Sequence, residues 1–469
     1  MKKTVIYFLI ILFLVSLMCS SVMATSATIG NETVTMNSCH GVDASSALLG
    51  SQKMVDNAKA VMLYETNSDT LMYAWNADER MYPASLVKIM TALVAVEQGN
   101  TADSVTVSES AISAIPIDAV SADLVSGEQI TLEELLYCLL VGSANDAAVV
   151  IAEHISGSQS AFVQAMNLRA QEIGCTGTQF TNAHGLHDDA QYTTARDSAR
   201  ILSAAMKNEV FRSVFTSIKH NVPATNMSSE RALVSGNSMM DSTSKLYYDP
   251  RVIGGRTGVT NDGRRCLASV AENNGMQLIC IVMGSDTVYQ EDGYSAITVG
   301  GYQETTALLN AGLDGYKSVQ VLFADQALRQ FPITNGDSDV IVGPKISVSA
   351  VLPDVVTAND LSMRYTDETL QAPVASGQQV SSVEVWYGNM CVAQAELFAM
   401  NSVKENNTLH TTDASSGNNG GWGVAAWIIV SILLVCLLIF AVPHITKRMR
   451  MIALTKRSKH YRSSRRRSR

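Results

Sequence analysis

The 469-residue chain lacks the cysteine spacings of metal-finger proteins. Its 8 cysteines include no CxxC pair, which excludes the usual cysteine-based zinc patterns. Cys266 and Cys280 flank a turn signal at 272–275 between two strand-like runs, so a disulfide across a hairpin is one interpretation. Buried free thiols are the other, and the pattern favours them. No internal repeat is visible, so a repeat architecture is excluded as well.

Outside its two ends, the chain lacks basic residues relative to acidic ones. Once Lys2, Lys3 and the residues after 446 are set aside, 21 Lys and Arg stand against 43 Asp and Glu, a net charge of −22. Such a surface repels polyanions, which excludes nucleic acid as a partner of the surface at large. The basic residues are concentrated instead from 447 to 469, where 11 Lys and Arg occur without any acid.

The N-terminal end lacks the composition of a folded core. Residues 1–24 contain the three parts of a secretory signal peptide: a basic start, an apolar run from Val5 to Met18, and small residues before an expected cleavage after Ala24. A lipoprotein attached through Cys19 is the weaker alternative, because Met18 is bulky where lipid attachment needs a small residue.

Near the C-terminus, the run from Val424 to Val442 has 19 residues without a charge. As a helix it would be about 28 Å long, which matches a bilayer core, and Trp422 and Trp427 lie at its outer end, where indole rings favour the interface. The basic segment beyond it predicts a cytoplasmic tail, so we expect the bulk of the protein outside the cell membrane, held by this single span. A buried helix of a soluble protein leaves the basic flank unexplained. A nucleic-acid-binding tail is also less favoured, because topology and anionic lipid explain the basic segment better.

Between the ends, hydrophobic periodicity predicts an α+β domain followed by a smaller β domain. Residues 60–64 and 71–75 form an expected hairpin, and strand-like runs return at 264–271 and 276–283. Helical patterns lie between these strands, at 85–98, 132–141, 146–155, 160–173 and 194–206. Because helices separate the two sets of strands, we expect the terminal strands to share one sheet.

Changes in composition predict the domain order. After residue 316 the chain has short β-rich runs, at 318–323, 346–352 and 383–387, and residues 406–421 resemble a flexible linker. We therefore predict a signal peptide (1–24), a flexible leader (25–54), the α+β domain (55–316), a small β domain (317–402), a linker (403–421), a transmembrane helix (422–443) and a basic cytoplasmic tail (444–469).

Ser85 and Lys88 are the first candidates for chemistry. They lie three residues apart at the start of a predicted helix, so the amine can reach the hydroxyl and act as its base. Pro83 suits a first turn, and the free backbone N–H groups of a helix start can stabilise an oxyanion. The spacing alone is weak, because Ser242 and Lys245 repeat it in an expected loop. The pair of Ser85 and Lys88 indicates acyl transfer. The alternative is that these residues form only a helix start with a surface lysine.

Two further motifs follow this pair along the chain. Ser143 and Asn145 lie between two helical patterns, where a turn can present a hydroxyl and an amide together. The run Arg256-Thr257-Gly258 precedes the second set of strands, and a cation beside a hydroxyl and a glycine suits a carboxylate that approaches a strand edge. Each of these motifs is common when taken alone.

In this order and at these distances, the motifs resemble the Ser-x-x-Lys, Ser-x-Asn and Lys-Thr-Gly set of penicillin-binding proteins and serine β-lactamases. The runs 76–85, 182–186 and 192–197 are similar to those of the low-molecular-mass D-alanyl-D-alanine carboxypeptidases, and 370–378 to the small C-terminal β domain of that family. The resemblance covers roughly residues 55–400. It implies a DD-peptidase fold, in which helices flank an antiparallel sheet beside a helical subdomain.

The resemblance also implies a role for each matching residue. Ser85 would attack the carbonyl of the penultimate D-alanine and form an acyl-enzyme, with Lys88 taking its proton. Ser143 would relay a proton to the leaving D-alanine, and Asn145 would hold the peptide backbone of the substrate. The backbone N–H groups of Ser85 and Val259 would form the oxyanion hole. The substrate's terminal carboxylate would bind at Arg256, Thr257 and Gly258.

The chain departs from the family at one position, because Arg256 stands where the family usually has Lys. A guanidinium can hold a carboxylate with two hydrogen bonds, so we expect substrate anchoring to survive. It does not give up its proton, which puts a proton relay through this residue in doubt. No cofactor or metal is implied. The run 184–189 has metal-ligand residue types, but the resemblance explains its first three residues as a turn, and we expect a solvated loop for the others.

The expected function is that of a membrane-anchored serine carboxypeptidase that trims peptidoglycan stem peptides and is inhibited by β-lactams such as penicillin. A D,D-endopeptidase that cleaves cross-links would use the same residues. A class A β-lactamase is disfavoured, since no Glu-x-x-Leu-Asn run lies between Ser143 and Arg256. The alternative outside enzymology is a wall-binding protein in which Arg256 marks a decayed site.

Overall fold

The computed structural model of the protein describes residues 47–406, apart from residues 51 and 263 and the segments 290–295 and 367–369. The predicted signal peptide, most of the leader, the transmembrane helix and the basic tail lie outside the described residues. Among the helices within these described ranges, none is both long and apolar enough to cross a membrane.

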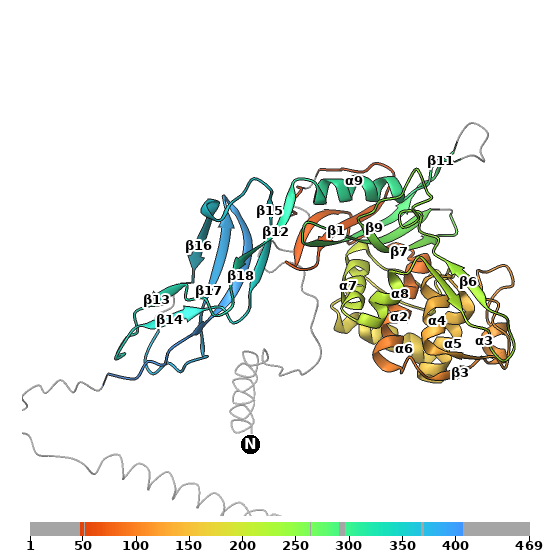
Figure 1. The fold of residues 1–469 in the computed structure, drawn as a ribbon, viewed down its shortest axis with the longest axis horizontal. Coiled ribbons are helices and arrows are strands. Elements are labelled where there is room, and N and C mark those ends of the chain that lie inside the picture. The colour runs from red at the N-terminus through yellow and green to blue at the C-terminus, as the bar shows by residue number, and fades with distance from the viewer. Residues whose placement is uncertain (1–46, 51, 263, 290–295, 367–369, 407–469) are drawn as a thin grey trace, which may run out of the picture. The chain divides into compact units, whose positions relative to one another are not determined.

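A five-stranded antiparallel sheet forms the centre of the N-terminal part, in the order β2-β1-β9-β8-β7 (Figure 1). The hairpin of β1 (Ala60–Glu65) and β2 (Thr70–Trp75) pairs with β9 (Met276–Ser285). The sheet continues through β8 (Arg265–Asn273) to β7 (Val252–Val259). Strands from the two ends of this part therefore share one sheet, as the sequence predicts.

Both faces of the sheet are buried. On β1, Met62 and Tyr64 belong to the core of the large helical part, whereas Val61 and Leu63 belong to the core under α9 (Tyr302–Leu313). This alternation follows from the two-residue period of a strand. Figure 1 shows α9 on one face of the sheet and α7 (Ala195–Met206) on the other.

The buried helix α2 (Val87–Gln98) is the centre of the helical part. Its residues from Val87 to Ala95 are all buried, and all of them except Lys88 and Thr91 are apolar, as expected for a helix enclosed by other elements. Its neighbours are α7, α4 (Leu132–Leu140), α5 (Asn145–Ser156) and α6 (Gln159–Glu172). These helices match the ranges that periodicity predicts to within two residues at each end.

Shorter elements complete this part, and the sequence patterns did not predict them. They are the helices α3 (Glu109–Ser113) and α8 (Glu209–Phe215) and the hairpins β3 (Ser104–Thr106) with β4 (Gln129–Thr131), β5 (Lys219–Val222) with β6 (Arg231–Val234), and β10 (Val288–Tyr289) with β11 (Ala296–Thr298). The helix α9 was not predicted either. Gly312 interrupts the apolar pattern of α9. A larger residue does not fit at this position, because a Cβ there would lie 2.7 Å from the side chain of Leu63.

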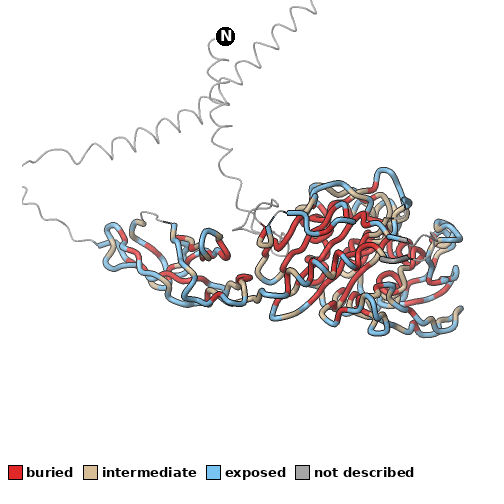
Figure 2. Tube along the Cα trace, turned by 90° about the horizontal axis from the view of Figure 1, so that it is seen from above, coloured by how far each residue is buried: buried red, intermediate tan, exposed pale blue. Residues whose placement is uncertain are grey.

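The described residues after 315 are β-rich, with one short 3₁₀ turn (η4, Ala358–Asp360). Strands β12 (Tyr316–Leu322) and β15 (Val348–Pro353) pair with each other. A second sheet has the order β13 (Arg329–Phe331), β14 (Val340–Gly343), β18 (Met390–Ala399), β17 (Gln379–Tyr387) and β16 (Leu361–Tyr365). This part has its own core around Val342, Val383 and Leu397, and Figure 2 shows buried residues along the interior of both parts.

The two cysteines of the second hairpin do not face each other. In the register of β8 and β9, Cys280 lies opposite Ser269, whereas the neighbours of Cys266 pair with Val282 and Ser285. Both thiols are free and buried, and burial raises the pKa of Cys266 to about 11 and that of Cys280 to about 12. The disulfide interpretation is therefore wrong and the free-thiol interpretation is confirmed.

Candidate active site

Ser85 lies in a single 3₁₀ turn, η3 (Ala84–Leu86), that leads into α2. The sequence predicted an α-helix from residue 85, whereas regular α-helix begins at Val87. Ala84 has φ +48°, in the left-handed region that L residues with a Cβ rarely adopt. Such local strain next to a half-buried serine is common at functional sites.

Lys88, one turn further on, is completely buried. Its Nζ lies 3.2 Å from Ser85 Oγ, 2.8 Å from Asn145 Oδ1 and 2.5 Å from the carbonyl oxygen of His184. Burial holds the pKa of this amine well below its ordinary value, the positive charge of Arg256 lowers it further, and Asp146 opposes the shift. Burial therefore favours the uncharged form of Lys88, which has a lone pair that can accept a proton.

The partners of Lys88 direct that lone pair. A neutral amine has two N–H donors, and two carbonyl-type oxygens, from Asn145 and His184, lie within donating distance. In the uncharged form of Lys88, the lone pair is then left for the third neighbour, the hydroxyl of Ser85, whose Oγ lies 3.2 Å from Nζ. Burial is also the largest cause that lowers the pKa of His184, to about 4.

Ser143 and Asn145 come from the turn between α4 and α5. Ser143 has φ +63°, and Asn145 is the first residue of α5. The Asn145 side chain donates from Nδ2 to the carbonyl of Val120 at 2.9 Å while its oxygen accepts from Lys88. Both ends of the amide are thus held by the protein, which fixes the orientation that Lys88 needs.

Arg256 reaches this turn from β7. Its Nη1 donates to the carbonyl of Leu140 at 2.9 Å and its Nη2 donates to Ser143 Oγ. The side chain is buried, and among the described residues no carboxylate pairs with it. Burial lowers its pKa to about 10, so the guanidinium is still charged at neutral pH. The site therefore contains one uncompensated positive charge beside Ser143.

The next residues of β7 run against the nucleophile turn. A Cβ on Gly258 would lie 3.0 Å from the backbone nitrogen of Ser85, so only glycine lets the strand come so close. Val259 follows at the end of the strand with its side chain exposed. The backbone of β7 thus lies beside the Ser85 N–H, where the sequence predicts an oxyanion hole from Ser85 and Val259. Thr257 is half-buried on the same strand.

The loop at 184–189 closes the site from another side. Gly185 has φ +86°, and a Cβ there would lie 2.1 Å from the carbonyl oxygen of Ala84. The Gly185 N–H donates to Asn182 Oδ1 at 2.7 Å, which holds the turn. Beyond it, His187 Nε2 lies 3.1 Å from the exposed carboxylate of Asp189. A small hollow lies between this loop, the nucleophile turn and the end of β7, lined by Tyr82, Pro83, Ala84, Gly185, His187, Val259 and Thr260 among others.

Two buried carboxylates that the sequence patterns did not reveal support the turn of Ser143 and Asn145. Asp146 accepts hydrogen bonds from Ser121 Oγ at 2.6 Å and from the backbone N–H groups of Ala122 and Leu124 at 3.0 and 3.1 Å. These bonds tie the segment 116–128 to the start of α5. Asp146 directly follows Asn145 at a helix start, and this position in the sequence could have indicated that it supports the site.

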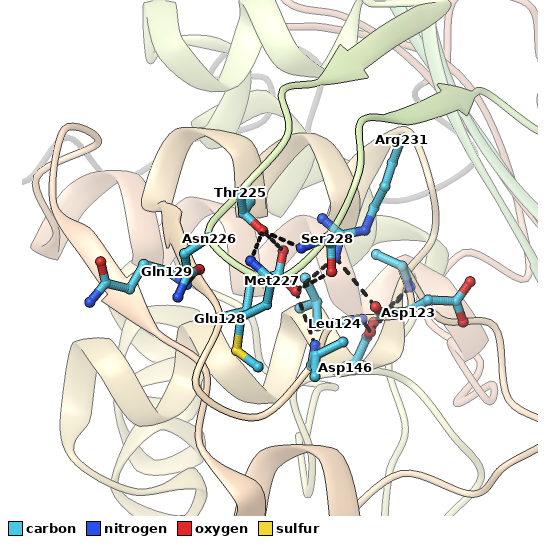
Figure 3. A network of polar contacts seen from close by, with 12 residues as sticks. Asp123, Leu124, Glu128, Gln129, Asp146, Thr225, Asn226, Met227, Ser228 and Arg231 are labelled. Carbon is cyan, nitrogen blue, oxygen red and sulfur yellow. Dashed lines mark hydrogen bonds and ion pairs between the residues drawn. The ribbon is translucent and has the colours of Figure 1, made fainter.

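The second carboxylate, Glu128, anchors the other end of that segment (Figure 3). It is fully buried and accepts from Arg231 Nη2 at 2.7 Å, Thr225 Oγ1 at 3.0 Å and the N–H of Val125 at 3.0 Å. Burial opposes ionisation, but these hydrogen bonds outweigh it and lower the pKa of Glu128. The segment beside Asn145 is therefore fixed both to α5 and to the β5–β6 hairpin. Nothing in the local sequence around Glu128 predicts its contacts with Thr225 and Arg231.

Together, an α+β domain and a half-buried serine beside a buried lysine define a serine hydrolase of the DD-peptidase fold. A family model described as D-alanyl-D-alanine carboxypeptidase matches residues 49–287, and one described as penicillin-binding protein 5, C-terminal domain, matches residues 316–405. The chain belongs to the D-alanyl-D-alanine carboxypeptidase family and is a serine peptidase.

Curated relatives and solved structures agree with this assignment. The chain is 31% identical to D-alanyl-D-alanine carboxypeptidase DacA of Haemophilus influenzae, over 74% of this chain and 86% of the relative. It is 27% identical to DacF of Bacillus subtilis, over 75% and 87% of the two chains. The structure of penicillin binding protein 5 from Haemophilus influenzae superposes with a TM-score of 0.64 at 30% identity, covering 76% of this chain and all of that one.

Proposed function

We propose that this chain removes the terminal D-alanine from peptidoglycan stem peptides through a covalent acyl-enzyme on Ser85. The observation that carries the proposal is the buried amine of Lys88, 3.2 Å from Ser85 Oγ, whose pKa burial holds well below its ordinary value. A serine hydroxyl is a weak nucleophile until a base takes its proton, and Lys88 is the group placed to do so.

The proposed reaction has two halves. Lys88 takes the Ser85 proton as Oγ attacks the carbonyl of the penultimate D-alanine, and the N–H groups of Ser85 and Val259 stabilise the oxyanion. The proton then passes by way of Ser143 to the leaving nitrogen, the C–N bond breaks, and free D-alanine departs. Water next attacks the ester while Lys88 takes its proton, and Lys88 then passes that proton to Ser85 Oγ as the ester C–O bond breaks. This step releases the shortened peptide and restores the Ser85 hydroxyl.

Arg256 is proposed to anchor the substrate's terminal carboxylate, together with Thr257 and Gly258. Its charge has no counter-ion among the described residues, and Ser143 lies in hydrogen-bond contact with it. With a pKa of about 10 the guanidinium stays protonated, so the proton route runs through Lys88 and Ser143. We therefore propose anchoring, and not proton relay, as the role of Arg256. Asn145 is proposed to orient Lys88 as well as the substrate.

The location is proposed from the ends of the sequence. A signal peptide (1–24) and a span at 422–443 followed by a basic tail would hold the protein in the cytoplasmic membrane of a bacterium with the catalytic domain outside. We propose the domain limits 55–316 and 317–402 on the same sequence grounds. Endopeptidase action on cross-links uses the same residues, and no described contact favours it.

Release of D-alanine from a diacetylated Lys-D-Ala-D-Ala peptide by the full-length chain in detergent tests the reaction. We expect release by the native protein and a loss of at least about 10³-fold in kcat in both Ser85→Ala and Lys88→Ala. Release that survives in either variant would overturn the assignment of nucleophile and base. No release by the native protein would favour a wall-binding role.

Penicillin gives an independent readout of the acyl-enzyme. We expect the intact mass to rise by the mass of one penicillin in the native chain and to stay unchanged in Ser85→Ala. Ser242→Ala is the matched control, because Ser242 has the same Ser-x-x-Lys spacing but lies in an exposed turn. A mass gain in Ser85→Ala would place the nucleophile elsewhere.

A further inference from the structure

Helix α2 has two polar side chains in its buried stretch, and they lie three residues apart. Of the residues from Val87 to Ala95, all of which are buried, only Lys88 and Thr91 are polar. Thr91, like Lys88, is completely buried. Residues three apart lie on one face of a helix, so the hydroxyl and the amine face the same side of the site. A buried hydroxyl needs a hydrogen-bond partner.

The partner of Thr91 is the bend that also contacts Lys88. Thr91 Oγ1 donates to the carbonyl of Ala183 at 2.6 Å, and Lys88 Nζ lies 2.5 Å from the carbonyl oxygen of His184. The carbonyl of Val87, one turn earlier on α2, is 3.4 Å from Thr91 Oγ1. A hydroxyl has only one proton to donate, and the closer oxygen takes it. Two successive carbonyls of one bend thus bind the two polar residues of one helix face.

Other hydrogen bonds of this loop fix its shape but not its place on α2. The side chain of Asn182 accepts from the N–H of Gly185 at 2.7 Å and donates to the carbonyl of Leu186 at 3.0 Å. Both bonds stay within the loop. Among the described residues of α2, Thr91 and Lys88 alone form hydrogen bonds with the loop. Thr91 is therefore the tether between the bend and the helix.

The place of the His184 carbonyl matters because this oxygen takes one N–H group of Lys88. An uncharged amine has two N–H groups and one lone pair. With Asn145 and His184 as acceptors, the lone pair is left for Ser85. If the His184 carbonyl moves away, the amine is free to turn and to present an N–H group to Ser85 Oγ. It then no longer acts as a general base.

We propose that Thr91 is a positioning residue for the reaction on Ser85. By binding the carbonyl of Ala183, its hydroxyl holds the next carbonyl of the chain, that of His184, against the amine of Lys88. Thr91 transfers no proton to the substrate and acts only through the bend. This inference rests on the proposed function, in which Lys88 is the base for Ser85.

Thr91→Val tests the proposal in the full-length chain in detergent, because valine has the shape of threonine without its hydroxyl. We expect the rate constant for acylation by saturating penicillin to fall by at least about 10-fold. The constant for non-covalent penicillin binding is expected to change by less than about twofold, since the lost contact serves the chemical step. Thr91→Ser keeps the hydroxyl and is expected to acylate within about threefold of the native rate.

The pH dependence of the loss separates misplaced carbonyls from a loosened site. In a loosened site, water would reach Lys88 and raise its pKa, so the loss in Thr91→Val would shrink as the pH rises. A misdirected lone pair impairs the uncharged amine itself. We therefore expect the loss in Thr91→Val not to shrink between pH 7 and pH 9.

Thr305→Val is the matched control. Thr305 is also completely buried, but it lies on α9, on the face of the sheet opposite α7, and its replacement is expected to keep the native acylation rate. Thermal unfolding shows whether each variant is folded, and Thr91→Ala carries the same expectation should Thr91→Val fail to fold. Failure of both to fold would overturn the positioning role in favour of a purely structural one.

The remaining outcomes distinguish this inference from the proposed function. A native acylation rate in Thr91→Val, an equal loss in Thr91→Ser or Thr305→Val, or a loss that shrinks as the pH rises would overturn the role of Thr91 alone. The proposed function would then stand. Native protein that is neither acylated by penicillin nor able to release D-alanine would overturn both.

Discussion

At the scale of the residue, Arg256 acts on Lys88 through its charge as well as on Ser143 through a hydrogen bond. Burial comes first among the causes that lower the pKa of Lys88, and Arg256 second. Removing that charge raises the pKa of the amine, so a higher pH is needed to keep it neutral. We expect the acid limb of the penicillin acylation rate to move by about 1 pH unit to higher pH in Arg256→Gln.

Arg256→Lys is the matched variant, because it keeps the positive charge and restores the residue usual in the family. Its acid limb is expected to stay where it is in the native protein. A profile that moves equally in both variants would mean that geometry, and not charge, sets the pKa of Lys88.

Gly185 is the second residue whose effect can be isolated. Gly185→Ala places a Cβ 2.1 Å from the carbonyl of Ala84, so the turn that carries Ser85 must shift. We expect kcat/KM to fall by at least about 10-fold, since small displacements of reacting groups are costly. Gly174→Ala is the control: its φ of +84° is nearly the same, but no atom lies within 4 Å of the added Cβ. It is expected to lower stability by about 1 kcal/mol and to leave kcat/KM unchanged.

At the scale of the element, the segment 116–128 depends on Glu128. Glu128→Gln leaves Arg231 buried beside a neutral amide. We expect the free energy of unfolding, measured by urea titration at pH 7, to fall by about 2–4 kcal/mol. Glu272→Gln breaks the exposed pair with Arg212 and is expected to cost less than about 1 kcal/mol. Equal losses in the two variants would contradict the importance of the buried network.

The depressed pKa of Glu128 also gives this network a pH dependence. Its folded pKa is lower than the ordinary value of 4.5, so the stabilisation is present above pH 4.5 and is lost as the pH falls through the folded pKa. The difference in unfolding free energy between the native chain and Glu128→Gln is therefore expected to shrink below pH 4.5. A difference that stays constant down to pH 3 would show that the carboxylate is not the stabilising group.

At the scale of the whole molecule, the β domain and the catalytic domain depend on different cores. Leu397 is fully buried in the core of the β domain, and Leu93 is nearly so on α2, the helix that carries Lys88. Replacing either with Ala leaves a cavity that costs about 2–5 kcal/mol. We expect Leu93→Ala to lower both thermal stability and D-alanine release, and Leu397→Ala to lower stability alone. Loss of release at 25 °C in Leu397→Ala would indicate that the β domain supports the site directly.

The local hydrophobic pattern of the sequence was sufficient to predict many of the helices and strands of this protein. The helices at 87–98 and 145–156 and the hairpin of β1 and β2 follow from periodicities of 3.6 and 2 residues, which are properties of the chain itself. The motif residues Ser85, Lys88, Ser143 and Arg256 were also found in the sequence, where their order and spacing outweighed the repeat at Ser242 and Lys245. The short elements and α9 were missed, because packing against the sheet stabilises them more than their own pattern does.

The sequence by itself determined the serine–lysine pair and the sharing of one sheet by strands from both ends of the catalytic domain. The signal peptide and the membrane anchor stay predictions, because they lie outside the described residues. Only the tertiary structure decided that Lys88 is buried with a lowered pKa, that Arg256 bonds Ser143, that Asp146 and Glu128 hold the neighbouring segment, and that Cys266 does not face Cys280. The reason is physical: pKa values, buried charges and strand register depend on groups that are distant in sequence and meet only when the chain folds.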